Sequence, residues 1–204
     1  MKFLNGGWMI KDGFDVKYAA NIYSADIARD DGVLTLYSPF GTPIHHPGQT
    51  LDGGLLTTEV SSPRPDVITV RMINFRTSRE HCPAFALHTA PAHVSIVEDD
   101  EAWTYTSGLL TLRIAKGDVI DFRYCYDGKE IAHSGLRAKA LVGHDRGVLH
   151  VAEQADSAVG ETIYGLGERV TKCIKKGPSV EIWNEDGATG TEKGDKNVPC
   201  YSSK

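Results

Sequence analysis

The sequence has 204 residues, 41% of them apolar, which is enough to bury one sizeable core, so we expect a single domain over residues 1–204. Its 22 basic and 27 acidic side chains give a net charge of -5 and are spread along the chain, which argues against nucleic acid as a partner. The chain start has no apolar run that could serve as a signal peptide, and no later run could span a membrane, so we expect a cytoplasmic protein without a membrane partner.

Alternating apolar and polar side chains predict β-strands along most of the chain. Ile68, Val70 and Met72 would face one side of a strand while Thr69 and Arg71 face the other, which is the pattern of a half-buried strand. No long amphipathic helix is predicted. The remaining predicted strands cover residues 33–37, 55–60, 93–97, 110–114, 119–125, 148–151 and 180–183.

Short turns separate these strands. Asp127-Gly128 predicts a hairpin turn, with Glu130 and Ile131 on the returning strand. Two stretches with weaker strand pattern, residues 39–54 and 132–146, are expected to be surface loops. Short strands joined by tight turns predict an all-β fold, an antiparallel β-sandwich.

Histidines and glycines suggest two kinds of site, and a structural explanation is preferred for both. His45 and His46 would point to opposite sides of an extended chain, and no His-Glu-x-x-His motif occurs. The Gly165-Leu166-Gly167 segment lacks the third glycine of a dinucleotide-binding loop. The sequence therefore predicts no metal site and no cofactor.

The last fifth of the chain places Trp183, Asn184, Glu185 and Asp186 in consecutive positions. An indole offers a flat apolar face to a pyranose ring, while amide and carboxylate groups form hydrogen bonds with its hydroxyls. The alternative is that Trp183 caps the end of the sandwich and is followed by a polar turn. Composition alone favours this alternative.

Three stretches carry a resemblance to glycoside hydrolase family 31. Residues 161–169, which read ETIYGLGER, resemble the family motif V-Y-G-L-G-E-R-F. Residues 177–187, which read GPSVEIWNEDG, and the later Thr191-Glu192 and Lys196-Asn197-Val198-Pro199 are similar to the α-xylosidase pattern with W-N-x-D-G-G-T and K-N-x-P. The opening of the chain also fits that pattern at Met1-Lys2-Phe3, Gly6, Trp8 and Gly13.

This resemblance implies an amino-terminal β-sandwich of the galactose-mutarotase-like type, packed on a catalytic (β/α)8 barrel. In similar enzymes a loop of the sandwich reaches over the barrel mouth and lends an acidic residue to the substrate site, and Asp186 matches that position. The resemblance thus suggests Asp186, Asn184 and Trp183 for substrate binding, with Asn184 mostly bracing the loop. It suggests Glu168 and Arg169 as structural residues that hold the sandwich to the barrel.

Hydrolysis in this family is retaining and needs two aspartates, which the resemblance places in the barrel. We therefore expect this chain to have no catalytic residues, to lack the barrel and to be inactive alone. Its expected partners are α-xyloside or α-glucoside sugars, bound weakly, and a family 31 barrel in cis or in trans.

Two further expectations concern the chain as a separate molecule. One alternative function is a stand-alone carbohydrate-binding or protein-interaction β-sandwich module. Because similar proteins continue beyond residue 204 into further strands, the sandwich is also expected to be incomplete at its C-terminus, with an open sheet edge that favours self-association.

Overall fold

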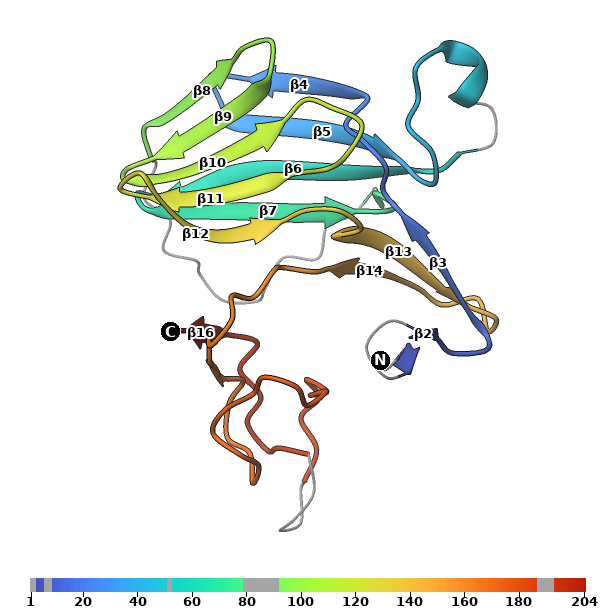
Figure 1. Ribbon diagram of the computed structural model, residues 1–204, viewed down its shortest axis with the longest axis vertical. Coiled ribbons are helices and arrows are strands. Elements are labelled where there is room, and N and C mark those ends of the chain that lie inside the picture. The colour runs from blue at the N-terminus through green and yellow to red at the C-terminus, as the bar shows by residue number, and fades with distance from the viewer. Residues whose placement is uncertain (1–2, 6–8, 51–52, 79–91, 187–192) are drawn as a thin grey trace. The chain divides into compact units, whose positions relative to one another are not determined.

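The computed structural model describes residues 3–5, 9–50, 53–78, 92–186 and 193–204 (Figure 1). These residues form two compact units, which are the sandwich unit, Asp12–Asp156, and the terminal unit, Met1–Lys11 with Ser157–Lys204. That both units make up one domain stays a prediction. The strands are β1 (Leu4–Asn5), β2 (Met9–Ile10), β3 (Phe14–Tyr18), β4 (Ser24–Ala28), β5 (Val33–Pro39), β6 (Leu55–Arg64), β7 (Val67–Ile73), β8 (Val94–Glu98), β9 (Ala102–Ser107), β10 (Leu110–Ala115), β11 (Phe122–Tyr126), β12 (Lys129–Ser134), β13 (Lys139–His144), β14 (Leu149–Glu153), β15 (Ile163–Gly165) and β16 (Tyr201–Ser203).

The sandwich unit contains two facing antiparallel sheets. One sheet has the order β12-β11-β10-β9-β8 and the other β4-β5-β6-β7, while β14-β13-β3 forms a third, smaller sheet. In Figure 1 the sheet of β8–β12 (green to yellow) lies over the sheet of β4–β7 (blue to teal). The expected all-β, antiparallel sandwich is therefore confirmed.

Apolar side chains from both facing sheets fill the space between them. Leu34, Leu36 and Val60 come from one sheet, and Leu112 and Phe122 come from the other, and all are at most 1% exposed. Burial at alternate positions removes one face of each strand from water, and this is the main favourable term in folding. The apolar positions of the alternating sequence pattern are therefore the positions buried in this core.

A buried tyrosine ties the two layers together. The Tyr105 hydroxyl on β9 donates a hydrogen bond to the carbonyl oxygen of Gly32 at 2.7 Å, in the turn between β4 and β5. Burial raises the pKa of Tyr105 to about 12, so the hydroxyl keeps its proton and remains a donor at any ordinary pH.

Most of the predicted strands are confirmed. Strands β5, β6, β7, β8, β10 and β14 lie where alternation predicts them, and β11 begins at Phe122, three residues later than expected. The Asp127-Gly128 hairpin turn joins β11 to β12, with both residues at positive φ. The predicted loop at 39–54 contains the 3₁₀ helix Pro47–Thr50, with residues 51 and 52 outside the described part. No helix of the described chain is long or apolar enough to cross a membrane.

The prediction of a loop at 132–146 is wrong, because most of these residues belong to β12 and β13. Strand β13 lies between β14 and β3, so it is covered on both edges and buries Ala140 and Val142. The strand was not predicted because it begins with Lys139, and a lysine interrupts the apolar pattern expected of a buried strand. Its side chain is nevertheless only 1% exposed, with its ammonium 2.5 Å from Glu153 Oε1 and 4.3 Å from the centre of the Phe122 ring.

The strand predicted at 180–183 is also wrong. The described chain has no ladder there, and the nearest pairing is an isolated bridge between Asn184 and Gly194. The apolar side chains Ile182 and Trp183 remain exposed. Their burial therefore does not stabilise a strand here. Strands β1, β2, β3, β4, β9, β15 and β16 were not predicted.

Candidate functional site

The glycine motif of the terminal unit supports a close approach of two backbones. Strand β15 pairs with β16, and the Leu166 amide continues the contact by donating to the carbonyl oxygen of Cys200 at 2.9 Å. Gly165 and Gly167 have φ of 108° and 86°. A Cβ on Gly165 would lie 2.6 Å from the Cys200 oxygen, and one on Gly167 would overlap the carbonyl oxygen of Lys196. Glycine is needed here for packing and not for holding a nucleotide.

Arg169 connects this motif to two later segments. Its Nε donates to the carbonyl oxygen of Leu166 at 3.2 Å, and its Nη2 donates to the carbonyl oxygen of Glu181 at 2.6 Å. Nη2 also donates to the side-chain oxygen of Asn197. The planar guanidinium suits this role because its N–H groups point in several fixed directions at once.

Asn197 completes what we call the Arg169–Asn197 clasp. Its side-chain nitrogen donates to the carbonyl oxygens of Trp183 at 2.7 Å and Gly194 at 2.8 Å. Both this nitrogen and the backbone amide of Asn197 lie 2.9 Å from Asn184 Oδ1. The side chain of Asn197 therefore braces the stretch that contains the predicted sugar-binding residues. The side-chain oxygen of Asn184 accepts its hydrogen bonds from Asn197.

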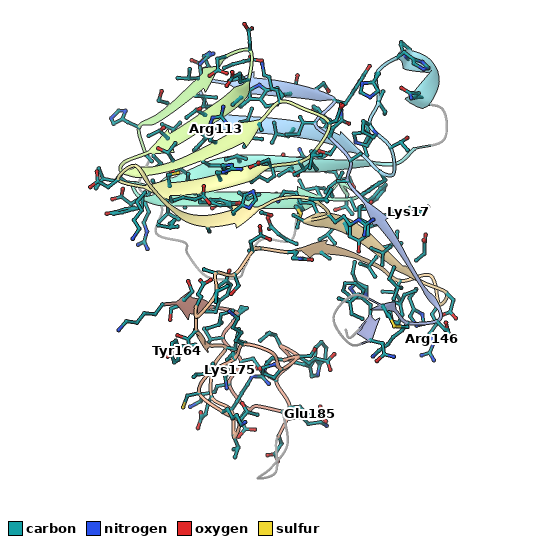
Figure 2. All side chains as sticks on the ribbon, viewed as in Figure 1. Lys17, Arg113, Arg146, Tyr164, Lys175 and Glu185 are labelled. Carbon is teal, nitrogen blue, oxygen red and sulfur yellow. The ribbon has the colours of Figure 1, made fainter. Side chains whose placement is uncertain are left out.

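The remaining groups of this stretch, residues 183–186, face solvent. The Trp183 residue is 73% exposed and Asp186 is exposed as well. Glu185, labelled in Figure 2, forms an ion pair with Lys193 at 2.5 Å. Asp186 makes no hydrogen bond or ion pair with any other residue in the described ranges. Residues 183–186 thus expose one indole and one carboxylate that has no partner in the described part of the chain.

Lys175 is a second polar anchor in the terminal unit and was not predicted from the sequence (Figure 2). The residue is 9% exposed, and its ammonium donates to Thr171 Oγ1 at 2.7 Å and to the carbonyl oxygen of Lys172 at 2.6 Å. Its backbone amide donates to the carbonyl oxygen of Ile163 at 2.7 Å. A lysine in a polar stretch gives no local signal of burial, so no sequence pattern could have found it.

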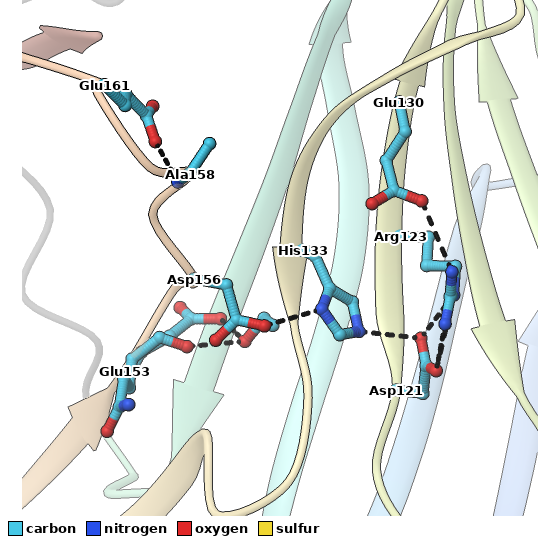
Figure 3. A network of polar contacts seen from close by, with 10 residues as sticks. Asp121, Arg123, Glu130, His133, Glu153, Asp156, Ala158 and Glu161 are labelled. Atoms are coloured by element: carbon cyan, nitrogen blue, oxygen red, sulfur yellow. Dashed lines mark hydrogen bonds and ion pairs between the residues drawn. The ribbon is translucent and has the colours of Figure 1, made fainter.

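A separate charged network lies at the end of the sandwich unit (Figure 3). His133 places Nδ1 2.7 Å from Asp156 and Nε2 3.3 Å from Asp121, which also accepts a hydrogen bond from Arg123 at 3.0 Å. Partial burial raises the pKa of Asp121, but the hydrogen bond and charge of Arg123 outweigh it and leave that pKa below its ordinary value. The network joins β11 and β12 to the last residue of the sandwich unit. It combines residues far apart in sequence, which is why no motif revealed it.

Metal-binding side chains do not gather in the part of the chain that the structure describes. No group of three or more His, Cys, Asp or Glu side chains there could hold a metal ion. His45 lies 3.7 Å from Asp118, and His144 lies 2.6 Å from Asp145. The described histidines in these contacts therefore act as partners of single carboxylates.

Comparison with known proteins finds a matching family model and similar curated proteins. The family model for the glycosyl hydrolase 31 N-terminal galactose mutarotase-like domain matches residues 57–203. The α-xylosidase XylQ of Lactiplantibacillus pentosus is 33% identical over 204 residues, covering 100% of this chain and 26% of that protein. The α-xylosidase of Emericella nidulans is 31% identical over 224 residues, covering 100% of this chain and 28% of that protein.

A solved structure has the same fold. The cycloalternan-forming enzyme from Listeria monocytogenes, in complex with a pentasaccharide substrate, matches with a TM-score of 0.70 and 17% identity. The match covers 93% of this chain and 17% of that one. At this identity the likeness concerns the fold alone. The chain spans about a quarter of the length of the curated relatives it matches.

Proposed function

The chain belongs to glycoside hydrolase family 31 as an N-terminal galactose mutarotase-like domain of the α-xylosidase type, and we propose that it is a non-catalytic part that contributes the 183–186 loop to a sugar site. The chemistry itself would come from a family 31 barrel, in cis or in trans. The loop would contact the leaving-group side of an α-xyloside or α-glucoside.

One observation carries this proposal, which is that the exposed carboxylate of Asp186 has no partner among the described residues and lies on a stretch held by the Arg169–Asn197 clasp. A carboxylate accepts hydrogen bonds from sugar hydroxyls, and a braced loop loses little conformational entropy when it does so. The exposed Trp183 ring offers an apolar face beside it. Asn184 would act through the loop, since its oxygen already accepts two hydrogen bonds from Asn197.

Glu168 and Arg169 are proposed as structural and interface residues. The contacts of Arg169 within the terminal unit support a role in shaping the loop. Glu168 is bound to Lys196 through its backbone, and its exposed side chain would be available to a barrel.

No pair of carboxylates in this chain is proposed for hydrolysis. The described polar network around His133 contains carboxylates already committed to Arg123 and to the histidine itself. A retaining mechanism needs one carboxylate free to attack and another free to donate a proton across the same bond. We therefore propose that the chain alone has no glycosidase activity.

Mixing tests this proposal directly. The full chain is added to the barrel of the L. pentosus α-xylosidase, expressed without its own N-terminal domain, and hydrolysis of an aryl α-xyloside is measured. We expect activity only in the mixture, with kcat/KM at least about tenfold lower for Asp186→Ala. Asp100→Ala, which changes an exposed carboxylate in a turn of the sandwich unit, is the matched control and should leave the rate unchanged.

Two outcomes of the mixing experiment would refute parts of this proposal. Hydrolysis by the chain alone, lost when one of its own carboxylates is changed, would refute a non-catalytic role. Equal rates with Asp186→Ala and Asp100→Ala would refute the role of the loop. Reading the gene beyond the Lys204 codon distinguishes a barrel in the same polypeptide from one supplied separately.

The exposed Trp183 ring also favours a second candidate, a stand-alone carbohydrate-binding module. In that case sugar would bind the chain without a barrel and quench the fluorescence of Trp183. We expect such binding to be lost in both Trp183→Ala and Asp186→Ala. Self-association through an open sheet edge remains a separate proposal, tested by sedimentation over a range of concentrations.

A further inference from the structure

A cavity in the sandwich unit is distinct in its residues from the 183–186 loop. Its volume is about 600 Å³, within the range of roughly 300–1,000 Å³ that small-molecule sites occupy. It is lined by residues 16–20 at the end of β3, by Phe40, Gly41 and Pro43, by Gly53 and Gly54, by Asp118, and by the turn between β12 and β13. None of its lining residues takes part in the proposed function.

The turn between β12 and β13 holds an arginine in an unfavourable backbone conformation. The amide of Ala138 donates to the carbonyl oxygen of Gly135 at 3.0 Å, which closes a tight turn with Arg137 as its third residue. Arg137 has a φ of 60°, a left-handed conformation in which glycine or asparagine would be less strained. Strain of this kind at a non-glycine residue often accompanies a functional side chain.

Arg137 lines the cavity together with Tyr18, and its guanidinium lies over the Tyr18 ring. Its central carbon lies 5.5 Å from the centre of the Tyr18 ring, close enough for a cation–π contact that uses the flat face of the group. Arg137 makes no hydrogen bond or ion pair within the described ranges. Its N–H donors, which lie in the plane of the group, are therefore available to a ligand.

Other groups around the cavity define what that ligand would be. Lys17 on β3, labelled in Figure 2, also lines the cavity and adds a second positive charge, 3.8 Å from Asp15 on the same strand. Asp118, which lies 3.7 Å from His45, supplies a carboxylate. Ala19 and Phe40 contribute apolar surface, and Gly41 leaves open space where a side chain would be. The cavity thus combines a cationic fork, one carboxylate and an apolar wall.

We propose that this cavity binds a sugar that carries a carboxylate, such as a uronic acid. The Arg137 fork would take the carboxylate through two parallel hydrogen bonds, a geometry that a neutral sugar cannot match. Asp118 would accept hydrogen bonds from the sugar hydroxyls, which a simple anion does not offer. The apolar wall formed by Ala19 and Phe40 suits the C–H face of a pyranose ring.

A titration followed by amide NMR of the full chain tests the proposal with three probes. D-glucuronate carries both features, D-glucose has hydroxyls without a carboxylate, and acetate has a carboxylate without hydroxyls. We expect glucuronate to shift the amides of Tyr18, Gly41 and Ala138, with each of the other probes binding at least about tenfold more weakly. Equal affinity for glucose would refute the carboxylate requirement, and equal affinity for acetate would refute the sugar requirement. Absence of shifts at these amides with glucuronate would refute the site.

Two variants separate binding from folding. Arg137→Gly suits the left-handed backbone, so we expect the Tm to be retained while glucuronate affinity falls at least about tenfold. Arg146→Ala, in the turn between β13 and β14 (Figure 2), removes an exposed positive charge elsewhere and should change neither. Unchanged affinity in Arg137→Gly would overturn the proposal, and so would an equal loss in Arg146→Ala.

Discussion

Different interactions stabilise the sandwich unit and the terminal unit, each considered by itself. Buried apolar side chains from two facing sheets form the core of the sandwich unit. In the terminal unit no apolar side chain among the described residues is buried, and the buried residues are Lys175 and Gly194. Hydrogen bonds around the glycine motif and the Arg169–Asn197 clasp hold that unit instead.

This difference predicts different responses to damage. Apolar burial is shared by many residues, so loss of one core side chain weakens the whole sandwich unit. Hydrogen bonds near the surface each contribute about 0.5–1.5 kcal/mol, so the terminal unit should open locally at low cost. Val170, Trp183 and Val198 are exposed on it, and this apolar surface supports the proposal that a barrel covers part of the unit.

The largest expected effect is in the core of the sandwich unit. Phe122 is 1% exposed, so Phe122→Ala should reduce the free energy of unfolding by about 3–5 kcal/mol through lost burial and a new cavity. Phe75 is 79% exposed, and Phe75→Ala should stay within about 0.5 kcal/mol of the wild type. Urea unfolding of both variants measures the difference. Similar losses would show that the core does not dominate stability.

Paired glycine substitutions compare backbone packing in the two units. Gly167→Ala adds a methyl group that overlaps the Lys196 carbonyl, so it should cost about 2–3 kcal/mol locally and expose the Leu166 and Glu168 amides to exchange. Gly128 has a φ of 76° with open space around it, so Gly128→Ala should cost only about 1 kcal/mol of strain. Hydrogen exchange by NMR checks both variants. Slow exchange of these two amides in Gly167→Ala would contradict the proposed tight contact.

The buried ammonium of Lys139 allows a test by pH. Burial lowers the pKa of Lys139, and the charge of Glu153 only partly opposes this. Between the lowered pKa and the ordinary value the unfolded chain binds more protons, so stability should rise with pH in that window. Lys139→Met should remove this rise and stabilise the sandwich unit at pH 7 by about 1 kcal/mol.

Urea unfolding at several pH values up to the ordinary lysine range provides the measurement for Lys139→Met. The variant Lys129→Met, at the exposed start of β12, is the control and should keep the rise with pH. A rise that persists in Lys139→Met would mean that another group causes it.

The smallest expected effect concerns surface ion pairs, which should matter little in either unit. Since the Asp121 pKa is lowered, the pair with Arg123 stabilises the fold above the unfolded pKa of the carboxyl and is lost as pH falls through the lowered value. Arg123→Ala should therefore cost about 0.5 kcal/mol at pH 6 and almost nothing near pH 2. Lys193→Ala, which breaks the pair with Glu185, should cost a similar amount at pH 6.

Unfolding curves of Arg123→Ala and Lys193→Ala over this pH range distinguish the two units. A loss well above 1 kcal/mol in Lys193→Ala would show that ion pairs, and not the clasp, stabilise the terminal unit.

The local sequence pattern predicts structure best where it agrees with the burial of the side chain. Ile68, Val70 and Met72 alternate with polar residues, and β7 follows that alternation. The pattern is misleading where a polar residue is buried, as with Lys139, or where apolar residues remain exposed, as with Ile182 and Trp183. In these cases the partner that decides burial comes from another part of the chain.

The candidate site shows the same division. The motif at residues 161–169 and the Trp183-Asn184-Glu185-Asp186 run could be found in the sequence because their residues are adjacent. Asn197 could be read only as part of a family pattern, because its role depends on hydrogen bonds to Arg169 and to residues 13 or more positions away. The roles of Asp186 and Trp183 in sugar binding stay predictions.

The sequence by itself determined the all-β class, most strands of the sandwich unit and membership of the family, because alternation and short motifs are local properties. Only the tertiary structure decided that Lys139 is buried, that Arg137 lies over Tyr18, and that Arg169 and Asn197 brace one loop. Each of these contacts joins segments separated in sequence, and their energies depend on burial and geometry that arise only when the chain has folded.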